Sequence, residues 1–189
     1  MTAVEIPKTI APDLKFRKMF EETSEEKVSN CFQCGKCTLG CPLAFAMDIY
    51  PHKVIHLLQY GQADEILRSD TIWVCASCET CTTRCPNGID IAHIMDSLRQ
   101  LSQKQGIKAA QPSVPIFHSA FLKSIKRHGR VHELEMALTY SIQNTGLLGP
   151  LKMTSYGLAM FLKGKVKIFP SRVRGLKHIK NLFNKTEAS

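Results

Sequence analysis

The 189-residue sequence predicts an all-α protein. Apolar residues recur at helical spacing in several segments, whereas the alternation typical of half-buried strands is nowhere sustained. Proline, glycine and capping residues stand where these segments would begin and end. All eight cysteines fall in two runs of identical spacing, and the helical segments lie between and after these runs.

The two cysteine runs indicate the chemistry of the chain. They are Cys31-x-x-Cys34-x-x-Cys37-x-x-x-Cys41-Pro42 and Cys75-x-x-Cys78-x-x-Cys81-x-x-x-Cys85-Pro86. Three cysteines at this spacing can wrap one loop around three irons of a 4Fe-4S cluster, and the cysteine before the proline ligates the other cluster in two-cluster proteins. We therefore predict two 4Fe-4S clusters: cluster A on Cys31, Cys34, Cys37 and Cys85, and cluster B on Cys75, Cys78, Cys81 and Cys41.

Two other uses of the cysteines are less favoured. Structural zinc sites usually draw on two separated Cys-x-x-Cys pairs and not on triplets followed by Cys-Pro. A disulfide framework suits a small secreted protein, but residues 1–18 show no apolar segment with a small-residue cleavage site. Iron-sulfur ligation is the interpretation that the spacing supports best.

The 33 residues from Pro42 to Val74 predict short helices between the runs. Pro51 suits a first helical position and Gly61 a C-terminal exit, with Val54, Leu57 and Leu58 forming an apolar stripe. A second turn is expected around residues 63–67. Ser69-Asp70-Thr71 offers a cap for a helical turn that contains Trp73, just before the second run.

After the second run, Asp90 can cap a longer helix that ends at Gly106. Its apolar positions recur at helical spacing: Ile91, Ile94, Met95, Leu98 and Leu101. A proline-marked break at residues 111–115 then precedes a cysteine-free half. Four helices are expected there, near residues 116–128, 132–144, 151–162 and 176–183, with Gly129, Gly146 and Gly164 as stops.

We accordingly expect an N-terminal arm (1–27), an α-helical dicluster domain (28–110) and a basic helical C-terminal extension (111–189). The net charge is +9, and residues 149–189 carry nine Lys/Arg against one Asp/Glu. The longest charge-free run has 16 residues and includes polar ones, so no membrane span is expected. A reducing, cytoplasmic location suits free cysteines and clusters.

The paired cysteine motifs on a helical scaffold resemble the α-helical ferredoxin domain, which also occurs in iron-sulfur proteins of succinate dehydrogenase and anaerobic glycerol-3-phosphate dehydrogenase. The sequence Cys31-Phe32-Gln33-Cys34-Gly35-Lys36-Cys37 and the helical extension are most similar to the C subunit of heterodisulfide reductase. The resemblance covers about residues 28–105, with a weaker match near residues 157–169.

This resemblance implies a non-catalytic electron-relay subunit of an oxidoreductase complex. In that family, the C subunit passes electrons between a flavin-containing A subunit and a cysteine-rich B subunit that reduces a disulfide or converts sulfur compounds. We expect no catalytic residue and no cofactor-binding residue beyond the cluster ligands, and no Gly-x-Gly-x-x-Gly follows a strand. The alternative is a stand-alone dicluster ferredoxin, or the iron-sulfur subunit of another anaerobic dehydrogenase.

The basic tail leaves several interpretations open. It can dock onto an acidic partner subunit, remain solvated, or lie peripherally on an anionic membrane with Leu176, Ile179, Leu182 and Phe183 on one face. No recognition motif supports nucleic-acid binding.

Charges beside the two cysteine runs suggest different reduction potentials. A cation near a cluster favours its reduction and a carboxylate opposes it. Because Lys36 lies in the first run and Glu79 in the second, we expect cluster A to have the higher potential unless the hydroxyls of the second run dominate. The alternative is that both charges point into solvent and are screened. Trp73 is expected to pack and exclude water, and the pairs His52/His56 and His128/His132 to be ordinary packing or surface residues.

Overall fold

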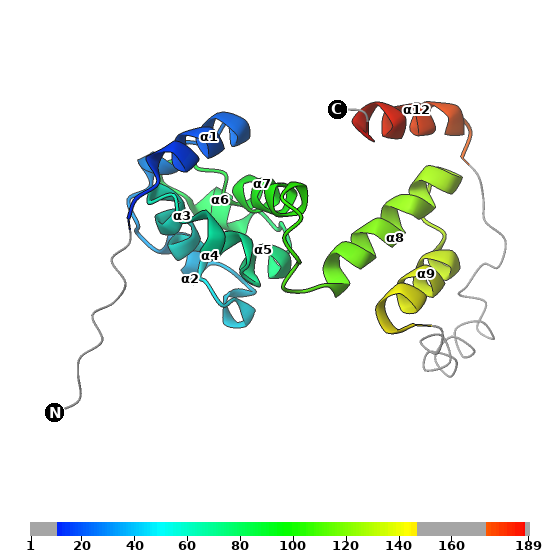
Figure 1. The fold of residues 1–189 in the computed structure, drawn as a ribbon, viewed down its shortest axis with the longest axis horizontal. Coiled ribbons are helices and arrows are strands. Elements are labelled where there is room, and N and C mark those ends of the chain that lie inside the picture. Colours follow the sequence, from blue (N-terminus) through cyan, green and yellow to red (C-terminus); the bar gives the residue numbers. More distant parts are fainter. Residues whose placement is uncertain (1–10, 147–172, 188–189) are drawn as a thin grey trace. The chain divides into compact units, whose positions relative to one another are not determined.

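The protein is helical throughout the residues that the computed structural model describes, which are 11–146 and 173–187. Every element there is an α-helix or a short 3₁₀ turn, so the predicted all-α class is confirmed for these ranges. The chain divides into two compact units after Gln111 (Figure 1). The predicted helix at residues 151–162, the stop at Gly164 and the weaker family match near 157–169 lie outside the described residues.

The core of the first unit lies between α3 (Pro51–Gln59), α4 (Ala63–Leu67), α5 (Thr71–Val74) and α7 (Ile91–Lys104). The predicted apolar stripe of α7 is buried from Ile91 to Leu98, while Leu101 is only half-buried. It meets the other buried apolar side chains of the unit: Val54, Ile55, Leu58, Ile66, Leu67, Ile72 and Trp73. Each such side chain contributes roughly 1.5–3 kcal/mol to the folding free energy when it is fully buried. This packing therefore holds α3 and α7, the helices that follow the two cysteine runs, in fixed positions.

The ends of these helices follow the predicted rules. Pro51 occupies the first turn of α3, and the Asp90 carboxylate caps α7 by accepting a hydrogen bond from the His93 amide at 2.9 Å. Gly61 and Gly106 follow α3 and α7 with φ of +69° and +66°, a left-handed backbone that glycine adopts readily.

The cap predicted for α5 comes from a different residue. Asp70 stands at the N-cap position but makes no side-chain capping bond. The Asp48 carboxylate, which follows the 3₁₀ turn η2 (Ala44–Ala46), accepts from the amides of Asp70 and Thr71 instead, both at 2.9 Å. The N-cap position thus lies within the predicted segment Ser69-Asp70-Thr71, but the carboxylate that satisfies these orphan donors belongs to a residue 22 positions away.

The segment predicted as an N-terminal arm contains α1 (Leu14–Ser24), which packs against α3 and α7. Asp13 caps α1, and its amide donates to the Tyr60 carbonyl at 2.9 Å. A Cβ atom on Gly61 would lie 1.9 Å from the Asp13 carbonyl oxygen, so this contact requires glycine. Helix α1 therefore docks on the C-terminal end of α3.

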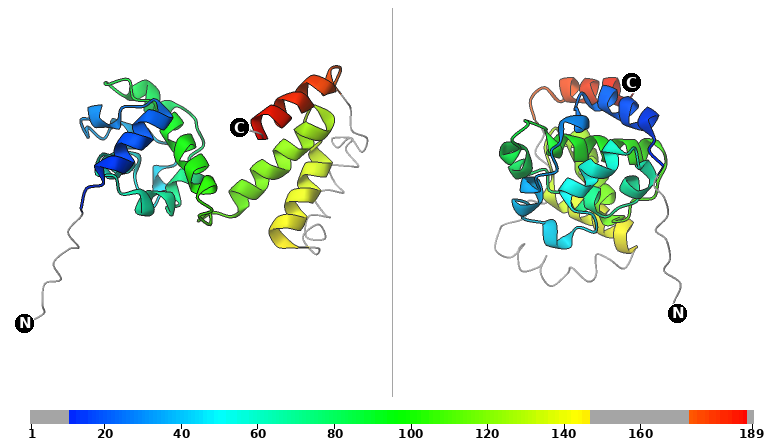
Figure 2. Two further views of the ribbon diagram at one scale, coloured as in Figure 1. Left: turned by 45° about the horizontal axis from the view of Figure 1, so that its top comes forward. Right: turned by 90° about the vertical axis from the view of Figure 1, so that its left-hand side faces the viewer.

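The second unit contains α8 (Ser113–His128), α9 (Glu133–Thr145) and α12 (Leu176–Glu187). Figure 2 shows α9 and α12 each lying alongside α8. Helix α8 begins three residues earlier than predicted because Pro115 is tolerated in a first turn, and α9 is shifted by one residue with His132 as its N-cap. Gly129 ends α8 at φ +80°, as predicted, so His128 and His132 do not share a continuous helix.

Candidate metal centre

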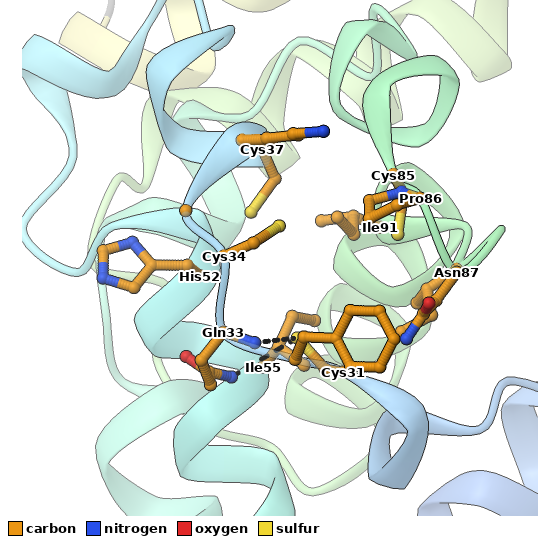
Figure 3. A pocket seen from close by; sticks show the side chains of 14 residues that line it. Cys31, Gln33, Cys34, Cys37, His52, Ile55, Cys85, Pro86, Asn87 and Ile91 are labelled. Atoms are coloured by element: carbon orange, nitrogen blue, oxygen red, sulfur yellow. Dashed lines mark hydrogen bonds between the residues drawn. The ribbon is translucent and has the colours of Figure 1, made fainter.

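Two cavities in the first unit each collect four cysteines. Cavity A is lined by Cys31, Cys34, Cys37 and Cys85, and cavity B by Cys41, Cys75, Cys78 and Cys81. Figure 3 shows the four thiols of cavity A directed into a common space from two separate chain segments. In each cavity, three cysteines come from one run and the fourth precedes the proline of the other run.

The same backbone path presents the cysteines in both runs. Residues two and four positions after the first cysteine have positive φ: Gln33 and Gly35 in the first run, and Ser77 and Glu79 in the second. These turns lead into the short helices α2 (Lys36–Leu39) and α6 (Thr80–Arg84), which contact each other. The contact between α2 and α6 brings each Cys-Pro end next to the opposite run.

The backbone hydrogen bonds of the last cysteine are the same in both runs. The amide of Cys41 donates to Thr38 O and that of Cys85 to Thr82 O, both at 3.1 Å. Equivalent residues of the two loops are therefore separated by 44 positions, and the first residues of α3 and α7 by 40 positions. The first unit is thus an internal repeat in which each loop is followed by its own supporting helix.

The rest of each cavity wall is largely apolar and also repeats. Ile55 of α3 and Ile91 of α7 line cavity A, while Met95 of α7 and Pro51 of α3 line cavity B. Apolar walls keep water away from a bound group and so influence its charge and potential. His52 also borders cavity A, but its Nδ1 lies 2.8 Å from the Thr38 hydroxyl, and the ring lies to one side of the thiols in Figure 3.

Burial and hydrogen bonding act in opposite directions on the pKa values of individual thiols. Desolvation raises the pKa of Cys37 to about 11 and also raises the pKa values of Cys75 and Cys81. In contrast, hydrogen bonding by the Thr80 hydroxyl and amide lowers the pKa of the exposed Cys78. Ligating thiols must lose their protons, so a cation in the cavity would supply the charge that stabilises the buried thiolates.

The donor set fits a polynuclear iron-sulfur group better than a single ion. No three His, Cys, Asp or Glu side chains among the described residues, which include all eight cysteines, converge closely enough to hold one metal ion. None of the eight cysteines forms a disulfide. Thiols spread around a common space can instead each reach a different iron.

The other predicted residues lie around this centre in different roles. Trp73 is 3% exposed in the core and lines neither cavity, which favours packing over an electron-path role. His56 packs edge-on against Tyr60, with 5.0 Å between ring centroids. Lys36 borders cavity A but is exposed, and Glu79 is also exposed. The sequence interpretation missed Arg99, which reaches back from α7 to the Cys75 carbonyl.

Comparison with known sequences agrees with this site. Residues 27–89 match the 4Fe-4S dicluster domain family, which implies two 4Fe-4S clusters, and this segment contains all eight cysteines. No helix in the described ranges has both the length and the apolar character needed to span a membrane.

The chain is similar to several curated C subunits of heterodisulfide reductases. The iron-sulfur C subunit of the CoB–CoM heterodisulfide reductase of Methanopyrus kandleri is 37% identical over 91 residues, covering 48% of this chain and 47% of that protein. The corresponding C 2 subunit of Methanocaldococcus jannaschii is 36% identical over 81 residues, or 43% of each chain. The C subunit of the ferredoxin:CoB-CoM heterodisulfide reductase of Methanosarcina mazei is 34% identical over 79 residues, 42% of this chain and 48% of that protein. The chain spans about half the length of the curated relatives it matches.

Proposed function

We propose that the chain is the electron-transfer subunit of a heterodisulfide reductase-like complex. Cluster A would be held by Cys31, Cys34, Cys37 and Cys85, and cluster B by Cys75, Cys78, Cys81 and Cys41. The observation that carries the proposal is that two cavities, each lined by three cysteines of one run and one of the other, lie within a single compact unit. When bound, each cluster supplies reversible one-electron transfer.

The chain's own residues would bind the clusters, exclude water and leave each one open on one side. Cys37 is buried, whereas the second cysteine of each run, Cys34 or Cys78, is exposed. The exposed ligands offer separate points at which electrons enter one cluster and leave the other. Disulfide chemistry would lie on the partners, because the proposed clusters would use all eight cysteines of this chain as ligands.

The partners we propose are a flavin-containing A subunit and a cysteine-rich B subunit. The relatives are named as C subunits of heterodisulfide reductases, which supports a multisubunit assembly. The second unit is suited to docking because its helices carry many basic residues and no cysteine.

The contacts of α12 favour docking of the tail over membrane contact. Leu176, Ile179 and Phe183 are half-buried beside α8, where Lys126 Nζ lies 5.9 Å from the Phe183 ring centroid. Most of the apolar face that a membrane would need is therefore already in use, while Leu182 stays exposed. The exposed lysines of α12 can still attract an acidic protein surface.

The test is an anaerobic purification of the complex from its native cells through a tag on this chain. We expect bound flavin and a cysteine-rich protein to co-purify, and the reduced flavoprotein to bleach the visible absorbance of the clusters until the B subunit reoxidises them. A Cys31→Ala/Cys85→Ala variant, which lacks two proposed ligands of one cluster, should assemble but not pass electrons. A cluster-loaded chain that comes without these proteins and exchanges electrons with neither would favour a stand-alone ferredoxin.

A further inference from the structure

Gln59 and Arg99 support the two cysteine loops in the same way. The Gln59 side-chain amide on α3 donates to Val28 O at 3.0 Å and to Cys31 O at 3.2 Å. Arg99 on α7 donates through Nε to Ile72 O and through a terminal nitrogen to Cys75 O. Each side chain therefore fixes the backbone of the first cysteine in its run.

The two sets of contacts are related by the internal repeat. Ile72 and Cys75 follow Val28 and Cys31 by 44 positions, the offset between the loops, and Arg99 follows Gln59 by 40, the offset between the helices. A third contact agrees with both offsets. Gln59 Oε1 accepts from Gln33 at 3.4 Å, and Arg99 donates to the Ser77 hydroxyl at 3.3 Å.

The two equivalent residues differ in charge. Gln59 is neutral, whereas an arginine side chain stays protonated at every accessible pH. The Arg99 side chain is 12% exposed, so its charge acts through protein and not through bulk water. Its ion-pair partner Asp96 lies 2.5 Å away but is 47% exposed, which weakens the opposing effect of that carboxylate on the cavity.

This difference outweighs the charges that the sequence interpretation relied on. Lys36 and Glu79 are both exposed, so water and salt screen their effect on a nearby cluster. Arg99 is mostly buried and hydrogen-bonded to the backbone of a proposed ligand. The buried charge beside Cys75 therefore favours the opposite order of potentials from the one expected from Lys36 and Glu79.

We propose that Arg99 makes cluster B the more readily reduced of the two, so that electrons pass from cluster A to cluster B and reside there. The inference rests on the cluster assignment in the proposed function. A nearby positive charge stabilises the reduced form, which carries one more electron and is more negative. The single electron that cluster A loses is the one that cluster B gains, and the external reductant is the electron donor of the complex.

The test compares charge-changing variants of the cluster-loaded chain by redox titration followed by electron paramagnetic resonance (EPR). Arg99→Gln should lower the potential of cluster B, the higher of the two. Gln59→Arg should raise the potential of cluster A, the lower of the two, because each change affects only the site that the residue supports. In the exchanged double variant, Gln59→Arg/Arg99→Gln, the order of the two potentials should invert. Arg99→Lys should keep most of the wild-type order, and Asp96→Asn should raise the potential that Arg99→Gln lowers.

Lys104→Gln is the matched control, since it removes one positive charge from the exposed C-terminal end of the same helix. It should leave both potentials unchanged. The inference is overturned if Arg99→Gln and Gln59→Arg, each with full iron content, leave both potentials in place. If Arg99→Gln does not load, Gln59→Arg decides alone. Loss of iron from the wild-type chain would instead contradict the cluster assignment, and failure to find partner subunits would leave the order of potentials standing.

Discussion

The Asp48 carboxylate holds the start of the helix that contains Thr71. One carboxylate oxygen of Asp48 accepts from the Thr71 hydroxyl at 2.7 Å and from the Thr71 amide at 2.9 Å. The other oxygen accepts from the Asp70 amide at 2.9 Å. Because α5 leads directly into Cys75, this contact links the segment after the first cysteine run to the start of the second.

Replacing Asp48 by alanine should destabilise the first unit. The change leaves the Asp70 and Thr71 amides without their acceptor, and the loss of such a cap costs about 1–2 kcal/mol. The measurement is the midpoint of guanidinium unfolding, followed by far-ultraviolet circular dichroism of the cluster-loaded chain under anaerobic conditions. Glu22→Gln, which removes an exposed carboxylate from α1, is the control and should leave the midpoint in place. An equal response of the two variants would show that the cap contributes nothing.

The contribution of Asp48 should depend on pH in a defined direction. Burial opposes ionisation of Asp48, but hydrogen bonds from the Thr71 hydroxyl and from the amides of Asp70, Thr71 and Ile49 outweigh it and lower the pKa of the carboxyl. A lowered folded-state pKa gives stability that is fully present above the unfolded value of 3.8 and is lost as the pH falls through the folded value.

A pH-jump experiment measures this dependence. We expect Asp48→Asn to lose its visible cluster absorbance faster than the wild type at neutral pH, with a ratio of rates that stays constant down to about pH 5. The two rates should converge only below the unfolded value of 3.8, as the pH falls through the lowered folded-state pKa. A ratio that grew on acidification would have the wrong sign for this account.

Gly61→Ala should be more harmful than the same change at Gly106. Both glycines have a positive φ, so both changes cost about 1–2 kcal/mol of backbone strain. A Cβ on Gly61 also meets the Asp13 carbonyl, whereas a Cβ on Gly106 meets no atom within 4 Å. Overpacking should add about 1–3 kcal/mol at Gly61. Thermal unfolding of the two variants checks this, and equal midpoints would mean that α1 does not dock as described.

Double cysteine variants distinguish crossed from uncrossed ligation. If Cys85 serves cluster A, then Cys31→Ala/Cys85→Ala should damage one cluster and keep about four irons per chain. Cys31→Ala/Cys41→Ala should damage both clusters. Uncrossed ligation predicts the reverse pattern, so iron analysis of the two variants decides, with circular dichroism as the check that each variant retains its helices.

The sequence was informative wherever structure depends on neighbouring residues. Pro51, Asp90 and Gly129 act where their local preferences place them, and helix α4 has the expected bounds. Local rules could not find the Asp48 cap or the supports Gln59 and Arg99, because these contacts join residues 22–31 positions apart. Aligning the cysteine runs at an offset of 44 and the following helices at 40 would have paired Gln59 with Arg99.

The most direct test of the central claim is the iron, sulfide and zinc content of the anaerobically purified chain, with EPR spectra after reduction. The account predicts about eight irons and eight sulfides per chain, and reduced signals broadened by magnetic coupling between two neighbouring 4Fe-4S clusters. Zinc in place of iron, or about four irons per chain with a single uncoupled signal, would contradict it.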